Sequence, residues 1–259
     1  MDYGRTFHAH HRMTADPVIG TTQLVALLQQ RIGRNADLAG KIAARAAEIG
    51  KRHQRLRAEW RKEAEKHWNK VPMTVPPLAL EVWRAIKDED WVLSAGTLHG
   101  WARKLWNFDR PYRHAGRALG TGTQIGTSLG VALAYKGSGR LVVDLQPDGD
   151  LMYDAGALWI AAKYQIPLLI VMYNNRAYYN DWNHQIVMAR TRGTDLSRAH
   201  IGMDLFGPAP DFAGLARSMG WWAEGPIENA DDLQPALKRA VAQVKTGKPA
   251  LVDAVTQHR

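Results

Sequence analysis

Residues 141–153 read LVVDLQPDGDLMY, and residues 168–178 read LLIVMYNNRAY. Each stretch opens with a short apolar run and then becomes polar. Short apolar runs separated by segments of helical length are typical of strands that are buried in a parallel sheet. In open sheets of this kind, ligands bind beyond the carboxyl ends of the strands. The two stretches therefore predict a ligand-binding edge formed by the residues that follow both strands.

The remainder of the chain beyond residue 77 continues this alternation. We expect strands over 91–93, 141–145, 168–173 and 250–255. A stretch with five glycines, 116–130, leads into a helix that ends at 134, and further helices are expected over 78–86, 156–163, 211–218 and 233–244. Strands that alternate with helices predict an α/β fold, a doubly wound parallel sheet with helices on both faces.

The first 70 residues differ in character from the rest. Residues 41–68 lack proline and repeat apolar residues every three or four positions, which predicts one long, basic amphipathic helix. A shorter helix is expected over 21–32, and three prolines within 70–77 indicate a linker. We therefore divide the chain into an N-terminal helical segment, 1–70, and a second domain, 71–259.

The formal net charge is +9 over 259 residues, a value that is compatible with nucleic-acid binding. Residues 1–75 carry +7 of this charge and the other 184 residues only +2, so the charge belongs to the helical segment. We interpret the basic helix as a surface that packs on a domain or subunit, and we expect no nucleic-acid partner. A nucleic-acid-binding module is the alternative interpretation.

The composition excludes several classes of site. The chain has no cysteine, which excludes disulfides, cysteine-ligated zinc or iron–sulfur clusters, and thiol nucleophiles. No apolar run approaches the roughly 18 residues needed to span a bilayer. The N-terminal residues also lack the apolar core of a signal peptide. We therefore expect a cytoplasmic protein with no membrane partner.

Acidic and amide side chains follow the two strands quoted first. Asp148 and Asp150 come after one strand, Asn174 and Asn175 come after the other, and Asn175 lies 27 residues beyond Asp148. This spacing accommodates a loop, a helix and the next strand, so both groups can lie at one edge of the sheet. An aspartate, an asparagine amide oxygen and a backbone carbonyl form an all-oxygen site that suits Mg²⁺. The alternative is that these residues only form turns and caps.

This pattern resembles the signature of thiamine diphosphate enzymes, in particular the group of acetolactate synthases, benzoylformate decarboxylases and 2-hydroxyacyl-CoA lyases. The likeness covers about residues 71–259, the diphosphate-binding domain of that group, although Pro147 replaces the first glycine of the signature. It implies thiamine diphosphate and Mg²⁺ as cofactors. By the family pattern, the metal ligands are the side chains of Asp148 and Asn175 and the backbone carbonyl of Ala177.

The resemblance also implies which residues contact the cofactor. The segment from Ser94 to His99 is similar to the loop that holds the diphosphate from the other side. Leu119 stands where the family places an apolar wedge under the cofactor, with Thr121 as the alternative. The cofactor-binding residues expected beside the three metal ligands are Gly96, Thr97, Leu98, His99, Leu119, Gly120, Gly149, Asp150, Leu151 and Tyr178.

In this family the residues after the second asparagine face the reacting carbon. Asp181 lies six positions after Asn175, where some decarboxylases carry a substrate-facing acid, and a carboxylate there can assist proton transfer. Tyr179 and His184 are the other candidate catalytic residues. The alternative for Asp181 is a helix N-terminal residue favoured by the helix dipole. For Tyr179 and His184 the alternative is a packing role.

The chemistry of the family also needs an activating glutamate, which lies on a separate pyrimidine-binding domain. The residues before 71 are too few for another doubly wound domain, and we identify no glutamate in this sequence for that role. We therefore expect one subunit of a split enzyme, in a hetero-oligomer such as α2β2, whose second protein subunit carries the pyrimidine-binding domain. The expected activity is that of a lyase or carboligase on a 2-oxo acid or acyl substrate.

Two other functions share the same domain. One is a 2-oxoacid oxidoreductase β subunit, although the absence of cysteine argues against direct ferredoxin-type electron transfer in this chain. The other is a thiamine diphosphate-binding regulatory subunit without catalytic activity.

Overall fold

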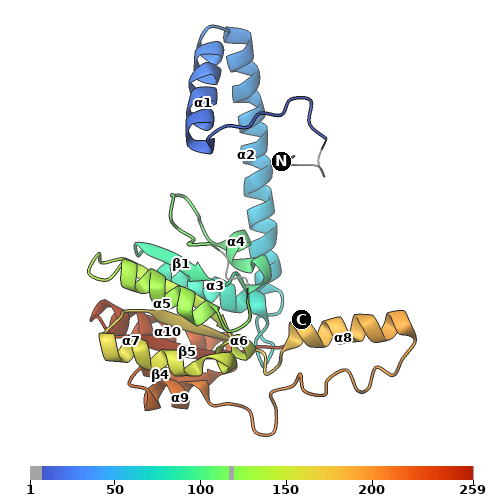
Figure 1. Cartoon of the computed structure of the whole chain (residues 1–259), viewed down its shortest axis with the longest axis vertical. Coiled ribbons are helices and arrows are strands. Elements are labelled where there is room, and N and C mark those ends of the chain that lie inside the picture. The colour runs from blue at the N-terminus through green and yellow to red at the C-terminus, as the bar shows by residue number, and fades with distance from the viewer. Residues whose placement is uncertain (1–7, 117–119, 259) are drawn as a thin grey trace. The chain divides into compact units, whose positions relative to one another are not determined.

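The computed structural model describes residues 8–116 and 120–258. The chain forms two compact units, Met1–Leu56 and Arg57–Arg259. The first unit is helical, whereas the second contains all the described strands (Figure 1). Within the described residues, no helix is both long and apolar enough to cross a membrane.

Two helices make up the first unit. α1 spans Pro17–Gly33, and α2 spans Ala36–Glu65, so α2 extends past the end of this unit. The Asp16 carboxylate caps α1 because it accepts hydrogen bonds from two backbone N–H groups of the first turn, each at 2.9 Å. The helices predicted over 21–32 and 41–68 are confirmed, and each begins earlier than predicted.

A parallel sheet of five strands forms the centre of the second unit, in the order β1-β2-β3-β5-β4. The strands are β1 (Trp91–Ala95), β2 (Leu141–Pro147), β3 (Leu169–Asn174), β4 (Trp222–Ile227) and β5 (Ala250–Val255). The four predicted strands are confirmed. The sequence did not indicate β4, because Gly225 and Pro226 are typical of turns. β4 lies at the edge of the sheet, where a proline is tolerated.

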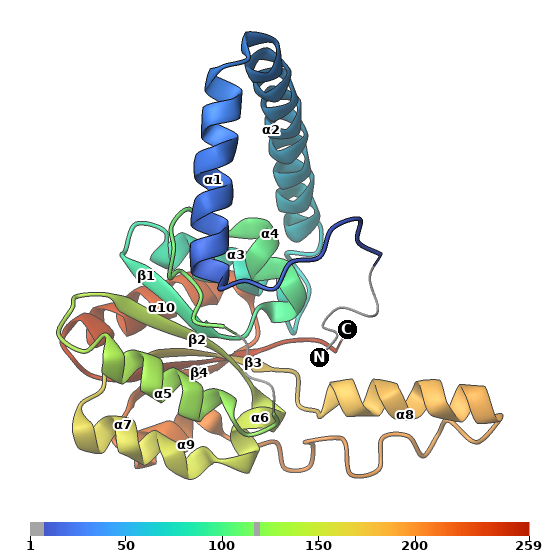
Figure 2. The same ribbon diagram turned by 45° about the horizontal axis from the view of Figure 1, so that its top comes forward.

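Helices cover both faces of this sheet (Figures 1 and 2). One hydrophobic cluster forms between the sheet and α3 (Val75–Ile86), α4 (Trp101–Leu105) and α10 (Ala230–Lys245). A second cluster forms on the other face with α5 (Gln124–Ala134), α6 (Asp148–Tyr153), α7 (Leu158–Tyr164) and α9 (Phe212–Ser218). Alternate residues of β3 enter the two clusters, as a strand with a period of two requires. The predicted doubly wound fold is therefore confirmed.

The prediction of a linker over 70–77 is wrong for its second half. Met73 is fully buried and donates a backbone hydrogen bond to Glu228 at 2.8 Å. α3 then begins at Val75, with a proline in its first turn. Proline is favoured there because the first N–H groups of a helix have no partner within the helix. The closely spaced prolines of this segment therefore indicate the start of α3 and not an extended linker.

The sequence also did not predict α8 (Tyr179–Arg192). None of its 14 residues is buried, so it lacks the apolar stripe by which amphipathic helices are recognised. Figure 1 shows α8 pointing away from the sheet of the second unit. It ends at Gly193, whose φ of 65° is the left-handed conformation common after helices.

Candidate functional site

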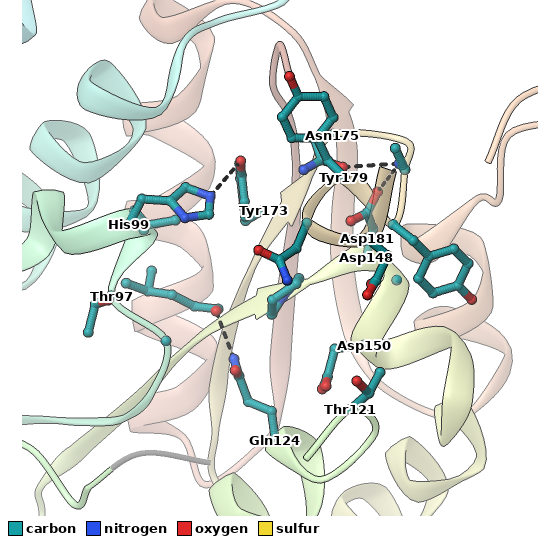
Figure 3. A pocket seen from close by; sticks show the side chains of 18 of the residues that line it. Thr97, His99, Thr121, Gln124, Asp148, Asp150, Tyr173, Asn175, Tyr179 and Asp181 are labelled. Atoms are coloured by element: carbon teal, nitrogen blue, oxygen red, sulfur yellow. Dashed lines mark hydrogen bonds between the residues drawn. The ribbon is translucent and has the colours of Figure 1, made fainter. Parts of the chain in front are cut away.

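A cavity of about 1220 Å³ opens where β1, β2 and β3 end. Figure 3 shows side chains from all three strand ends pointing toward it. The residues predicted from the sequence that line this cavity are Gly96, Thr97, Leu98, His99, Thr121, Asp148, Gly149, Asp150, Asn175, Ala177, Tyr178, Tyr179 and Asp181. The structure thus brings most of the predicted residues together at the expected edge of the sheet.

Asp148 is the first residue of α6 and is only 1% exposed. Burial raises the pKa of Asp148 to about 7, although backbone hydrogen bonds oppose that effect. One of these bonds comes from the Ala177 N–H, 3.1 Å from Asp148 Oδ2. The neighbouring Gly149 is required because a Cβ atom there would lie 2.6 Å from the Tyr178 ring. The first turn of α6 therefore holds a buried carboxylate against the start of the next loop.

The two asparagines after β3 point in different directions. Asn174 Nδ2 donates to Asp253 Oδ1 at 2.9 Å, within the sheet. Asn175 lines the cavity, and its Oδ1 accepts from the Ala177 N–H at 3.0 Å. Because Asp148 accepts from the same N–H, the two side-chain oxygens converge on one donor.

This convergence fits a hard cation. Two oxygens with partial or full negative charge lie close together, and a cation of the Mg²⁺ type prefers such ligands. Ala177, whose carbonyl the family pattern makes the third ligand, also lines the cavity. The described residues contain no group of three or more His, Cys, Asp or Glu that could hold a metal. A mixed set of aspartate, asparagine and backbone carbonyl is consequently the candidate metal site.

The loop after β1 forms the opposite wall of the cavity. Gly96 has a φ of 77°, and a Cβ atom there would collide with the carbonyl oxygen of Leu145. Leu98 and His99, in a short 3-10 turn (Leu98–Gly100), also have positive φ values of 47° and 55°. His99 Nε2 lies 2.9 Å from the hydroxyl of Tyr173 on β3, so a hydrogen bond joins the two walls.

Asp150 is held by groups from two elements. Its Oδ1 accepts from the Gly122 N–H at 2.7 Å, and its Oδ2 accepts from Gln146 Nε2 at 2.9 Å. Leu151 is fully buried in the core beneath α6, and its side chain does not line the cavity. Gly120 does not line it either.

The position of the apolar wedge stays a prediction. Leu119 lies outside the described residues, whereas Thr121, the alternative, lines the cavity.

The first turn of α8 contributes the candidate catalytic residues. Tyr179 and Asp181 line the cavity, and the Tyr179 ring stacks on His258 with centroids 5.0 Å apart. His184 lies one turn further along α8, exposed, and is not part of the cavity lining. Of the three candidates, only Tyr179 and Asp181 can contact a ligand in this cavity as it stands.

Sequence reasoning missed several lining residues. Tyr173 carried a usable signal, because it lies two positions before Asn175 and side chains two apart on a strand share a face. Arg103, Phe108 and His114 also line the cavity. Burial and the neighbouring Arg103 lower the pKa of His114. These three residues come from a loop and a short helix without a recognisable pattern, so no signal pointed to them.

Residues 94–254 match the model of the family described as thiamine pyrophosphate enzyme, C-terminal TPP binding domain. The chain belongs to this family. Thiamine pyrophosphate is another name for thiamine diphosphate. The matched residues include both walls of the cavity and the residues after β2 and β3.

Curated relatives are large subunits of acetolactate synthase. The large subunit of acetolactate synthase isozyme 3 from Escherichia coli (strain K12) is 28% identical over 177 residues. The large subunit from Buchnera aphidicola subsp. Schlechtendalia chinensis is 26% identical over 177 residues. Each alignment covers 66% of this chain but only 29% of the relative, so the chain spans under a third of the length of these proteins.

Solved structures share the fold. The thiamine diphosphate-dependent 4-hydroxybenzoylformate decarboxylase of Rhodococcus jostii RHA1 superposes with a TM-score of 0.61 at 23% identity, over 73% of this chain and 34% of that chain. Benzoylformate decarboxylase from Polynucleobacter necessarius gives a TM-score of 0.54 at 20% identity, over 71% of this chain and 33% of that chain. At these identities the likeness establishes the fold alone.

Proposed function

We propose that this chain is the diphosphate- and Mg²⁺-binding part of an enzyme that cleaves or forms a C–C bond next to a carbonyl. The convergence of the Asp148 and Asn175 oxygens on one N–H, inside a domain of the thiamine pyrophosphate family, carries this proposal. Both side chains and the Ala177 carbonyl would ligate Mg²⁺. When bound, thiamine diphosphate supplies a carbon nucleophile and an electron sink.

The remaining lining residues would divide between cofactor and substrate. The loop Gly96–His99 would hold the diphosphate from one side, and Asp150 in the first turn of α6 would approach it from the other, because both line the cavity next to the proposed metal ligands. Asp181 and Tyr179 would face the substrate. A 2-oxo acid is the proposed substrate class, and this agrees with the 4-hydroxybenzoylformate named for a protein of the same fold.

We also propose that a pyrimidine-binding domain on a second polypeptide completes the site. None of the described residues that line the cavity is a glutamate, so the activating glutamate would come from that domain. The two chains would form a hetero-oligomer.

Calorimetric titration of the full chain with thiamine diphosphate tests the cofactor site. Binding of thiamine diphosphate is expected to require Mg²⁺. If thiamine diphosphate binds neither to the chain alone nor to a mixture of the chain with a pyrimidine-domain protein, the proposed site is excluded. Turnover of 2-oxo acids tests the division between two chains. We expect turnover only in that mixture, and efficient turnover by this chain alone would contradict the split arrangement.

A further inference from the structure

Gln124 is the first residue of α5, and it lines the cavity (Figure 3). Only 8% of its surface is exposed. Its side-chain Nε2 donates to Asp144 Oδ1 at 2.7 Å and to the backbone carbonyl of Leu145 at 2.8 Å. Both partners lie on β2. Two short hydrogen bonds therefore hold a buried amide group against the strand at the wall of the cavity.

The partners of Gln124 also decide which end of its amide faces the cavity. A backbone carbonyl such as that of Leu145 only accepts hydrogen bonds, so the group directed at it is the amide NH₂. No donor among the described residues bonds to the amide oxygen, Oε1, and this oxygen is not enclosed by protein. Because the residue lines the cavity, Oε1 is the end that is left for a ligand.

Asp144 is an unusual residue for its position on β2. Val142, two residues earlier on the same face of the strand, packs in the hydrophobic cluster that includes α5, and Asp144 itself is fully buried. Burial raises the pKa of Asp144 to about 7, although the hydrogen bond from Gln124 opposes the rise. Within the described part of the chain, Asp144 Oδ2 has no hydrogen-bond partner. A buried carboxyl group that is only partly satisfied is costly, so its contact with Gln124 is a better reason for it than stability.

We propose that Gln124 is a specificity-determining residue, whose Oε1 accepts a hydrogen bond from a neutral N–H or O–H group of the ligand in the cavity. Asp144 is the positioning residue that holds the amide in this orientation. The identity of the ligand rests on the proposed function, whereas the direction of the amide follows from its two partners on β2.

The chemistry of the proposed ligands limits the source of the donor. An ionised diphosphate and the carbonyl and carboxylate of a 2-oxo acid have only acceptor oxygens, so none of them can donate to Gln124 Oε1. The amino group on the pyrimidine ring of thiamine diphosphate is one possible donor, and a hydroxyl group on the side chain of a 2-oxo acid is the other. A site that bonds such a donor rejects an analogue without it, because a buried polar group is then left unpaired.

Gln124→Met tests both sources, because it removes the amide and keeps the length of the side chain. For the cofactor, calorimetry compares thiamine diphosphate with oxythiamine diphosphate, in which an oxygen replaces the amino group. The titrations contain Mg²⁺ and use the full chain, alone or with the pyrimidine-domain protein. If the cofactor supplies the donor, wild type is expected to prefer thiamine diphosphate by about 10-fold or more, and Gln124→Met is expected to lose this preference.

The second comparison uses two substrates, 4-hydroxybenzoylformate and benzoylformate, which differ by one hydroxyl group. If the substrate supplies the donor, the preference for the hydroxylated acid in kcat/KM of the two-chain mixture is expected to fall about 10-fold in Gln124→Met, with cofactor preference unchanged. Gln185→Met is the matched control for both comparisons. Gln185 is exposed on α8 and lies outside the cavity lining, so its variant is expected to keep the preferences of wild type.

Variants of Asp144 separate positioning from a purely structural role. Asp144→Val removes the acceptor, whereas Asp144→Asn keeps an oxygen to which Gln124 Nε2 can donate. Asp144→Val is expected to weaken the ligand preference without lowering the midpoint of urea unfolding, and Asp144→Asn is expected to restore the preference. In ¹H–¹⁵N spectra without ligand, the Gln124 amide protons are expected to exchange faster in Asp144→Val than in wild type. If Gln124→Met does not fold, Asp144→Val carries the test.

The outcomes separate this inference from the proposed function. A wild type that shows neither preference, or a Gln124→Met variant that keeps the one that wild type shows, overturns the role of Gln124. Unchanged exchange of the Gln124 amide in Asp144→Val overturns the positioning role of Asp144. In each case the proposed cofactor site is upheld if thiamine diphosphate binds with Mg²⁺ and Asp148→Asn abolishes that binding. If wild type binds no thiamine diphosphate, alone or in the mixture, both are overturned.

Discussion

Two asparagine–aspartate pairs lie at the carboxyl edge of the sheet, and they differ in how the amide is oriented. In the closed pair, Asn174 and Asp253, the amide NH₂ donates to the carboxylate at 2.9 Å. In the open pair, Asn175 and Asp148, the amide oxygen and the carboxylate both accept from the Ala177 N–H, at 3.0 and 3.1 Å. In the closed pair, the amide and the carboxylate form a hydrogen bond with each other. The open pair instead presents two oxygens that a cation can bind.

The comparison shows that neither residue type nor burial identifies a ligand site. All four side chains are buried, with exposures between 1% and 6%. The asparagines are adjacent in sequence, and successive residues of an extended chain point to opposite sides. The position of each amide relative to the cavity therefore decides whether the pair stabilises the sheet or offers ligands.

Removing the negative charge of Asp148 in the open pair is expected to have the largest effect on cofactor binding. Asp148→Asn should weaken Mg²⁺-dependent binding of thiamine diphosphate by more than about 100-fold. This exceeds the loss of affinity that is typical when a residue hydrogen-bonded to a metal ligand is removed. The free energy of unfolding should not decrease, because burial disfavours the ionised Asp148 that the variant replaces. Calorimetry and urea unfolding measure the two effects. Asp253→Asn, in the closed pair, is the matched control and should bind the cofactor like wild type.

Breaking the closed pair is expected to affect stability instead. Asn174→Ala leaves the buried Asp253 without its amide donor, and an unsatisfied buried group of this kind costs about 1–3 kcal/mol. Urea unfolding should show this loss, with metal binding unchanged. Asn175→Ala should give the reverse result, weak metal binding and a smaller loss of stability. Equal losses of stability in the two variants would contradict the distinction between the pairs.

The pH dependence of stability gives the smallest expected difference. Burial raises the pKa of Asp253 to about 6 from 3.8, although the Asn174 hydrogen bond opposes the rise. Between these values the native state binds more protons than the unfolded state, so stability falls as pH increases. From pH 4 to pH 7.5, wild type should therefore lose about 2 kcal/mol more than Asp253→Asn in urea unfolding. A parallel pH dependence of the two proteins would show that Asp253 titrates normally.

The parts of the fold that the sequence predicted are those with a strong local pattern. Apolar runs indicated β2, β3 and β5, and a doubly wound sheet followed from their alternation with helices. β4 contains Gly225 and Pro226, and α8 has no buried residue, so neither shows the pattern of its class. The prolines after residue 70 resembled a linker because local sequence does not show that α3 packs on the sheet.

The candidate site shows the same limit. The spacing of Asp148 and Asn175 predicted that they meet, because parallel strands bring their carboxyl ends to one edge. Their different hydrogen-bond directions depend on the Ala177 N–H, which no sequence pattern reveals. Tyr173 was missed because an aromatic residue at the end of an apolar run resembles ordinary core.

α8 carries Tyr179 and Asp181 in its first turn, and none of its 14 residues is buried. Surface substitutions away from special features usually change stability by no more than about 0.5 kcal/mol. Sequence changes along the outer turns of α8 therefore have little effect on folding, while its first turn borders the cavity. Under the proposed function, in which Tyr179 and Asp181 face the substrate, substitutions around this turn can alter substrate preference with little compensating change in the core.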